Sequence, residues 1–121
     1  MSASILVVDD QPVNMKLAVT LLRHEGYAVS QAVDAETAFT MIKLSPPNLV
    51  LLDLQLPGMD GLSLARLVRA DEATKHVRLV ALTAHAMASD IEDALAAGCD
   101  GCITKPIDTR KFPHQVAAFL K

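Results

Sequence analysis

Short apolar runs alternate with longer segments of helical periodicity along the whole of this 121-residue chain. The first, third and fourth runs are almost wholly apolar, which is typical of strands covered by helices on both faces of a sheet. A helix-like segment follows each run. Five strand–helix alternations predict an α/β fold, an open three-layer sandwich around a parallel sheet with right-handed crossovers. The predicted strands are Ile5–Val8, Tyr27–Ala32, Leu49–Leu52, Leu79–Leu82 and Gly101–Thr104.

Start and stop signals for helices lie between these runs. The first helix is expected over Pro12–Glu25, since proline is favoured in a first turn and Gly26 follows as a left-handed cap. Asp34 is the expected N-cap of the second helix, which must end before Ser45 because two prolines follow that residue. The third helix is expected over Leu62–Ala70.

The last two helices have less regular starts. Ser89 and Glu92 have the spacing of a capping box, so the fourth helix is expected to begin at Ser89 and end at Gly98. The fifth is expected over about Thr109–Leu120. Pro113 falls within its first turns, where a late or irregular start avoids the loss of a backbone hydrogen bond.

Composition narrows the class of protein. The chain has the length of one domain, residues 1–121, and carries 11 Lys and Arg against 14 Asp and Glu, with no Trp and one Tyr. A nucleic-acid binder would show a basic stripe or a stacking platform, so direct nucleic-acid binding is not expected. The apolar runs are too short to cross a membrane, and no export signal precedes them. With two cysteines and no export signal, we expect a cytoplasmic protein.

Polar residues follow four of the predicted strands. Asp9 and Asp10 come after the first strand, Asp53 after the third, Thr83 after the fourth and Lys105 after the fifth. In a parallel α/β sheet the ligand site lies beyond the carboxyl ends of the strands. If the first and third strands are central, three carboxylates, a hydroxyl and an ammonium group meet at one rim.

Such a cluster has definite chemistry. Neighbouring carboxylates either share protons or bind a cation, and a ligand set made only of oxygen favours Mg²⁺, with Mn²⁺ or Ca²⁺ as alternatives. A carboxylate beside the ion can attack phosphorus and become an aspartyl phosphate. Lys105 would then neutralise phosphoryl charge, and Thr83 could donate a hydrogen bond to a phosphoryl oxygen.

With these residues in this order, the chain resembles the receiver domain of two-component response regulators over essentially its whole length. The resemblance implies a doubly wound, flavodoxin-like (βα)5 fold with strand order 2-1-3-4-5, as in single-domain chemotaxis regulators. The matching residues are Asp9-Asp10, Asp53, Pro57 with Asp60-Gly61, Thr83-Ala84 and Lys105-Pro106.

The resemblance also implies roles for individual residues. Asp53 would be the phosphoacceptor, and Asp10 with Asp9 would hold Mg²⁺ together with the backbone carbonyl of Gln55. The peptide bond between Lys105 and Pro106 would be cis, a form that is inexpensive only before proline.

Partners follow from the same resemblance. The phosphoryl group would come from a phosphohistidine of a sensor histidine kinase or a histidine phosphotransfer protein. Its arrival would draw Thr83 inward and repack the face made by the fourth helix, fifth strand and fifth helix, where a downstream protein would bind. The chain would be a single-domain regulator or a piece of a longer regulator or hybrid kinase.

Three positions are distinctive within this resemblance. Receivers usually carry an aromatic residue three positions before the lysine, and here Cys102 stands in its place as the switch position. Gln55 and His85 follow Asp53 and Thr83 by two residues, and the resemblance implies that side chains at these positions tune phosphate hydrolysis. A solvent-facing loop position is the equal alternative for both.

Other functions fit the residues less well. Cys99 and Cys102 form a C-x-x-C pair, but the pair follows the end of a predicted helix, where the dipole disfavours a thiolate, so we expect packing residues. An aspartate-nucleophile phosphatase needs a second carboxylate two residues after the nucleophile, where Gln55 stands. A flavin module would need a phosphate-binding loop in place of Asp9-Asp10. A degenerate receiver that docks partners without phosphorylation is the alternative left open by Cys102.

Overall fold

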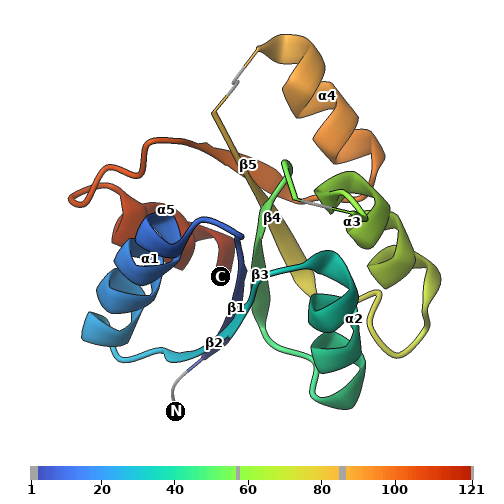
Figure 1. The fold of residues 1–121 in the computed structure, drawn as a ribbon, viewed down its shortest axis with the longest axis horizontal. Helices are drawn as coiled ribbons and strands as arrows, with labels where there is room; N and C mark the ends of the chain where they lie inside the picture. The colour runs from blue at the N-terminus through green and yellow to red at the C-terminus, as the bar shows by residue number, and fades with distance from the viewer. Residues whose placement is uncertain (1–2, 57, 85–86, 121) are drawn as a thin grey trace.

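The computed structural model describes residues 3–56, 58–84 and 87–120 and has the predicted architecture. All five strands are parallel and lie in the order β2-β1-β3-β4-β5, which confirms the predicted fold class and strand order (Figure 1). The strands are β1 (Ser4–Val8), β2 (Ala28–Ala32), β3 (Leu49–Asp53), β4 (Arg78–Thr83) and β5 (Gly101–Thr104). The helices are α1 (Pro12–His24), α2 (Ala35–Leu44), α3 (Gly61–Ala70), α4 (Ala88–Ala96) and α5 (Phe112–Leu120).

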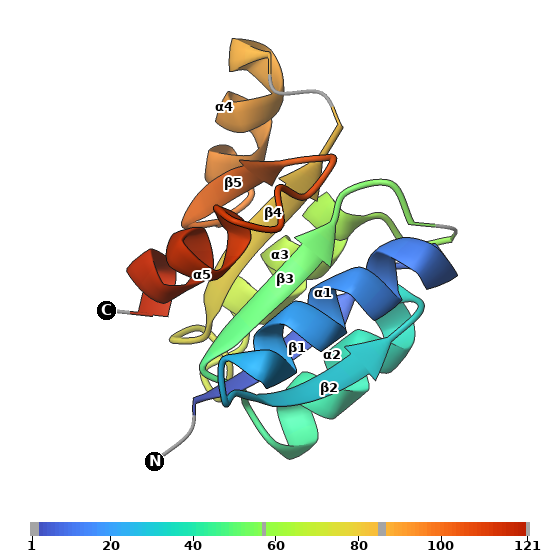
Figure 2. The same ribbon diagram turned by 90° about the vertical axis from the view of Figure 1, so that its left-hand side faces the viewer.

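Two hydrophobic cores lie on the two faces of the sheet. Helices α2, α3 and α4 cover one face and α1 and α5 cover the other, as Figures 1 and 2 show from two sides. Alternate residues of the central strands enter opposite cores, so Val50 and Leu52 pack with α2 and α3 while Leu49 and Leu51 pack with α1 and α5. This double burial explains why β1, β3 and β4 are apolar runs without alternation.

Caps place the starts and ends of the first three helices close to the predicted positions. The Asp34 side chain accepts a hydrogen bond from the Thr37 N–H, as an N-cap of α2 should. Gly26, the second residue after α1, has φ of +91°, a backbone conformation that glycine adopts without steric cost. The loop before α3 ends with Asp60, whose side chain accepts from the Ser63 N–H.

The predicted capping box of the fourth helix is wrong. Met87 is the N-cap of α4, and its carbonyl accepts from the N–H groups of Asp90 and Ile91. Ser89 therefore lies inside the first turn, and the N-cap carries no side-chain hydrogen bond. The capping preference of serine therefore does not set the start of this helix.

The fifth helix starts late, as Pro113 predicted. The side chain of Asp108 accepts from the N–H groups of Arg110 and Lys111 and holds a turn, and regular helix begins only at Phe112. Pro113 is then the second helical residue, where its missing N–H costs nothing. Within the described residues, no helix has both the length and the apolar character that crossing a membrane requires.

Candidate functional site

The central strands β1 and β3 carry the carboxylates of the site. They are parallel neighbours with Val8 paired to Leu52, so the next residues, Asp9 and Asp53, lie side by side at the rim. Asp9 and Asp53 are buried, and Asp10 is partly exposed. One oxygen from each of the three carboxylates lies within 4.8 Å of the others. The three acids converge as the ends of the strands predict.

Lys105 bridges the two buried carboxylates. Oδ1 of Asp9 accepts from the Gln11 N–H at 2.8 Å, and Oδ1 of Asp53 accepts from the Gln55 N–H at 2.9 Å. The Oδ2 atoms both accept from Nζ of Lys105, at 3.1 Å for Asp9 and 2.8 Å for Asp53. Backbone amides therefore hold one oxygen of each acid while a single ammonium group faces the other.

The strand β5 delivers Lys105 to this position. Thr83 and Thr104 are paired at the ends of β4 and β5, and the Lys105 N–H donates to the Thr83 carbonyl at 2.7 Å. The Lys105–Pro106 peptide is cis. The buried Thr83 ends β4 between the acids and the lysine strand. All five residues that follow or end the strands thus belong to one rim.

Burial and charge act in opposite directions on the ionisable groups. Burial raises the pKa of Asp9 above its ordinary value, and this outweighs the backbone hydrogen bond from Gln11 and the attraction of Lys105. Burial alone would lower the pKa of Lys105, but the hydrogen bonds and charges of Asp53 and Asp9 raise it. Lys105 is therefore held as a cation.

Gly61 allows the first turn of α3 to approach the end of β3. A Cβ atom at this residue would lie 2.6 Å from the Asp53 carbonyl oxygen and 2.9 Å from Cα of Leu54. These are backbone atoms, which can shift only at a cost in stability, so glycine is the residue that fits without strain. The sequence identified Gly61 only as one of the residues that carry the family resemblance, because the contact itself depends on how α3 packs.

A small cavity of about 170 Å³ adjoins the site on the α4 side. It is lined by Thr83 and Gln55 together with Asp60 and two residues of α4, Asp90 and Asp93. Nothing in the sequence pattern pointed to Asp90 or Asp93, because the position of α4 relative to the sheet is a tertiary property.

Other residues singled out in the sequence lie at exposed positions or outside the described residues. The side chain of Gln55 is exposed. His85 and Pro57 lie outside the described residues. His24, His76 and His114 are all exposed. None of these three histidines belongs to the acidic cluster.

The C-x-x-C pair has the character of packing residues. Cys99 is buried and Cys102 is partly buried against the same core. Burial raises the pKa of the Cys99 thiol to about 11 and also raises the pKa of Cys102. A reactive cysteine needs a lowered pKa, so neither thiol is activated.

Comparisons with known proteins place this chain in one family. A family model for the response regulator receiver domain matches residues 5–117. The chain is 42% identical over 108 residues to the response regulator PleD of Caulobacter vibrioides, an alignment covering 89% of this chain and 24% of PleD. It is 32% identical over 120 residues to the polar-differentiation response regulator DivK of Brucella ovis, covering 99% of this chain and 98% of DivK.

Solved structures show the same relationship. The receiver domain of the sensor histidine kinase PA1611 from Pseudomonas aeruginosa superposes with a TM-score of 0.90 at 32% identity, covering 99% of this chain and 98% of that one. That structure has a magnesium ion coordinated in its active-site cleft. The chemotaxis response regulator CheY4 of Vibrio cholerae has the same fold, with a TM-score of 0.94 at 22% identity over 98% and 99% of the two chains.

The fold and the acidic rim thus define a signalling module of the two-component class. The chain belongs to the response regulator receiver domain family. It spans only 24% of the length of PleD, whereas it matches nearly the whole of DivK.

Proposed function

We propose that residues 1–121 form one receiver domain of a two-component or phosphorelay system that accepts a phosphoryl group on Asp53. The observation that carries the proposal is the Lys105 ammonium group, which contacts both Asp53 and Asp9 at the rim of the sheet. An ionised carboxylate beside a fixed cation is suited to attack phosphorus, because the cation stabilises the charge of the phosphoryl oxygens.

The acidic cluster fits a divalent cation. Its three carboxylates lie within 4.8 Å of one another and offer only oxygen, the ligand type that Mg²⁺ prefers. Asp9, Asp10 and Asp53 would hold Mg²⁺, or Mn²⁺ in its place, with the backbone carbonyl of Gln55 as a further ligand. When bound, the ion supplies positive charge opposite the phosphoryl oxygens.

The donor is a phosphohistidine of a sensor histidine kinase or a histidine phosphotransfer protein. An oxygen of Asp53 forms a bond to phosphorus while the phosphorus–nitrogen bond of the donor breaks, and the imidazole nitrogen keeps the electron pair. Lys105 pairs with a phosphoryl oxygen of the product, and the Thr83 hydroxyl donates to another. The domain thereby promotes its own phosphotransfer and dephosphorylation without acting as a metabolic enzyme.

The output is a change in the face formed by α4, β5 and α5. Thr83 ends β4 at the edge of a cavity that α4 also lines, so movement of its side chain reaches that helix directly. Cys102 in β5 is the switch position, and a downstream protein binds this face. The two free cysteines fit a reducing compartment, and we place the reaction in the cytoplasm.

Intact-mass measurement after incubation with acetyl phosphate tests the proposal. We expect gain of one phosphoryl group that requires Mg²⁺ and is lost in Asp53→Asn. Asp71→Asn is the matched control, because Asp71 follows α3 at the opposite end of the sheet and Asn can still accept from the Ala73 N–H. It should be phosphorylated like the wild type.

Two further measurements separate this function from phosphorylation-independent docking. Phosphoramidate serves as a second small donor, and isothermal titration calorimetry measures Mg²⁺ binding. If neither donor phosphorylates the protein and Mg²⁺ does not bind, the chain is a docking module. Phosphorylation that persists in Asp53→Asn would instead assign the acceptor to another residue.

A further inference from the structure

The loop of residues 54–60 leads from β3 to α3 and carries Gln55, whose backbone carbonyl is a ligand of the proposed metal site. The first half of this loop is fixed from within the sheet and the core. The Leu54 N–H donates to the Leu82 carbonyl at 3.3 Å, and Leu56 is buried in the core that α2 and α3 cover. The position of the loop then depends on what holds its second half.

Helix α2 holds the second half of the loop through one side chain. The Met59 N–H donates to Oε1 of Glu36 at 3.3 Å, although the two residues are 23 positions apart. Glu36 is an exposed residue in the first turn of α2, the helix that Asp34 caps. The same Oε1 atom lies beside the preceding residue, since a Cβ at Gly58 would be 3.5 Å from it. Among the described residues, this is the one hydrogen bond that ties positions 58–60 to an element other than α3.

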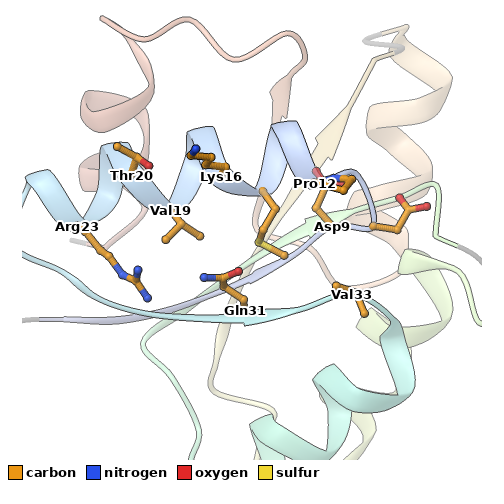
Figure 3. Close-up of a pocket in the computed structure, with 10 residues that line it drawn as sticks. Asp9, Pro12, Lys16, Val19, Thr20, Arg23, Gln31 and Val33 are labelled. Atoms are coloured by element: carbon orange, nitrogen blue, oxygen red, sulfur yellow. The ribbon is translucent and has the colours of Figure 1, made fainter.

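The connection between β2 and α2 also supports the other side of the acidic rim. The Asp9 N–H donates to the Ala32 carbonyl at 3.1 Å. Figure 3 shows Asp9 and Val33 at one end of the groove between α1 and β2, with the first turn of α2 directly beyond Val33. One short segment therefore fixes the backbone of a buried acid through Ala32 and the loop after β3 through Glu36.

We propose that Glu36 is a positioning residue for the metal site, which holds in place the loop that carries the Gln55 carbonyl. This inference rests on the proposed function, in which that carbonyl and the three carboxylates bind Mg²⁺. Groups that orient metal ligands through hydrogen bonds change metal affinity by about tenfold or more. The second strand brings no polar residue to the rim, so the connection that follows it serves the site through this residue of α2.

Isothermal titration calorimetry with Mg²⁺ tests the proposal. Glu36→Ala removes the acceptor of the Met59 N–H, so we expect Mg²⁺ to bind about tenfold more weakly. Glu36→Gln keeps a side-chain oxygen that accepts a hydrogen bond, so its affinity should stay within about twofold of the wild type. Glu25→Ala is the matched control, because Glu25 is an exposed glutamate after α1, at the other end of the sheet, and should bind Mg²⁺ like the wild type.

Two further measurements separate positioning from a general loss of structure. Amide hydrogen exchange of Met59, followed by NMR without Mg²⁺, should be faster in Glu36→Ala and near the wild-type rate in Glu36→Gln. Urea midpoints of both variants should stay close to the wild type, because the contact is exposed and solvent replaces it. The Mg²⁺ concentration for half-maximal labelling by acetyl phosphate should rise in Glu36→Ala by the same factor as the dissociation constant.

Three results would overturn the proposal. These are an unchanged Mg²⁺ affinity in Glu36→Ala, an equal loss of affinity in both Glu36 variants, or exchange of the Met59 amide that is the same in all proteins. A wild type that neither binds Mg²⁺ nor takes up phosphate would refute the proposed function and this inference with it. Mg²⁺ binding by the wild type with no loss in Glu36→Ala would overturn this inference alone.

Discussion

The ammonium nitrogen of Lys105 lies 2.8 Å from Oδ2 of Asp53, although the two residues are 52 positions apart in the chain. Their strands are not neighbours, because β4 lies between β3 and β5. The lysine side chain therefore reaches across the end of β4 and continues to Asp9, beyond β1. Two buried carboxylates share this one cation, so the site retains negative charge that a divalent ion can balance.

Replacing the lysine should separate metal binding from phosphoryl transfer. In Lys105→Met the carboxylates lose a cation that competes with Mg²⁺. We therefore expect Mg²⁺ to bind about tenfold more tightly, because the interaction between two unit charges at this distance is on the order of 1 kcal/mol or more. Phosphorylation by acetyl phosphate should be about 100-fold slower, the usual cost of losing one charge-stabilising group. Calorimetry and intact-mass time courses measure the two effects.

Lys111→Met controls for the loss of a lysine and should change neither quantity. If Mg²⁺ affinity and phosphorylation rate are both unchanged in Lys105→Met, the bridge between the acids has no role in the reaction.

The close approach of α3 to the end of β3 should be sensitive to a single methyl group. Gly61→Ala places Cβ against the Asp53 carbonyl, so we expect a loss of about 1–3 kcal/mol in the free energy of unfolding. Because the shift is transmitted to the backbone of Asp53, the phosphorylation rate should fall as well. Urea denaturation and acetyl phosphate labelling are the measurements.

Gly26→Ala is the matched control. Its added Cβ meets no atom within 4 Å, but φ of +91° strains an alanine, so stability should fall by about 1 kcal/mol through the backbone alone. Phosphorylation should not change in this variant. Equal phosphorylation rates in the two alanine variants would contradict the role assigned to Gly61.

Arg69 should be the surface residue whose loss is most costly. Its guanidinium group donates to the carbonyls of Gly98, Lys75 and Val77 and to the carboxylate of Asp100, which joins α3 to the start of β4 and to the turn before β5. Arg69→Gln should lower the free energy of unfolding by about 3 kcal/mol, because several acceptors lose their donor together. Urea denaturation at neutral pH measures this.

Arg66 lies on the same helix and is exposed. Arg66→Gln should change stability by less than about 0.5 kcal/mol. A similar small effect in Arg69→Gln would show that solvent replaces these hydrogen bonds at no cost.

Acid sensitivity should trace to the helix caps. Backbone N–H groups of Thr37 and Ser63 donate to Asp34 and Asp60 and lower the pKa of each carboxyl. A carboxyl whose pKa is lower in the folded state stabilises the protein at any pH above its unfolded-state pKa, which is about 4. That stability is lost as the pH falls through the pKa of the folded state.

Asn caps helices without titrating. The double variant Asp34→Asn with Asp60→Asn should therefore lose less stability than the wild type as the pH falls below about 4. Urea midpoints over an acidic pH series measure this. Glu72→Gln, at an exposed residue after α3, should keep the wild-type pH dependence. If the urea midpoints of the wild type and the double variant fall in parallel with pH, the two caps are not the cause of the acid sensitivity.

Local sequence signals predicted the bounds of helices accurately where those bounds depend on nearby residues. The Asp34 cap and Gly26 bound their helices because a side-chain hydrogen bond and a positive φ act within a few residues. The start of α4 was predicted wrongly at Ser89, because the N-cap is Met87, two residues earlier, and it makes no side-chain cap hydrogen bond. Tyr27 was included in the second strand, which begins only at Ala28.

The sequence by itself determined the alternation of strands and helices and the polar residues that end the strands. Burial on both faces of the sheet selects apolar residues within the strands, so polar functional residues lie at the strand ends. Only the tertiary structure decided that Lys105 crosses the end of β4 to two acids, that Gly61 meets the Asp53 backbone, and that Asp90 and Asp93 of α4 line a cavity beside Thr83. These features depend on the distances between elements that are remote in the chain. Local periodicity carries no information about such distances, because they are set by the packing of whole helices on the sheet.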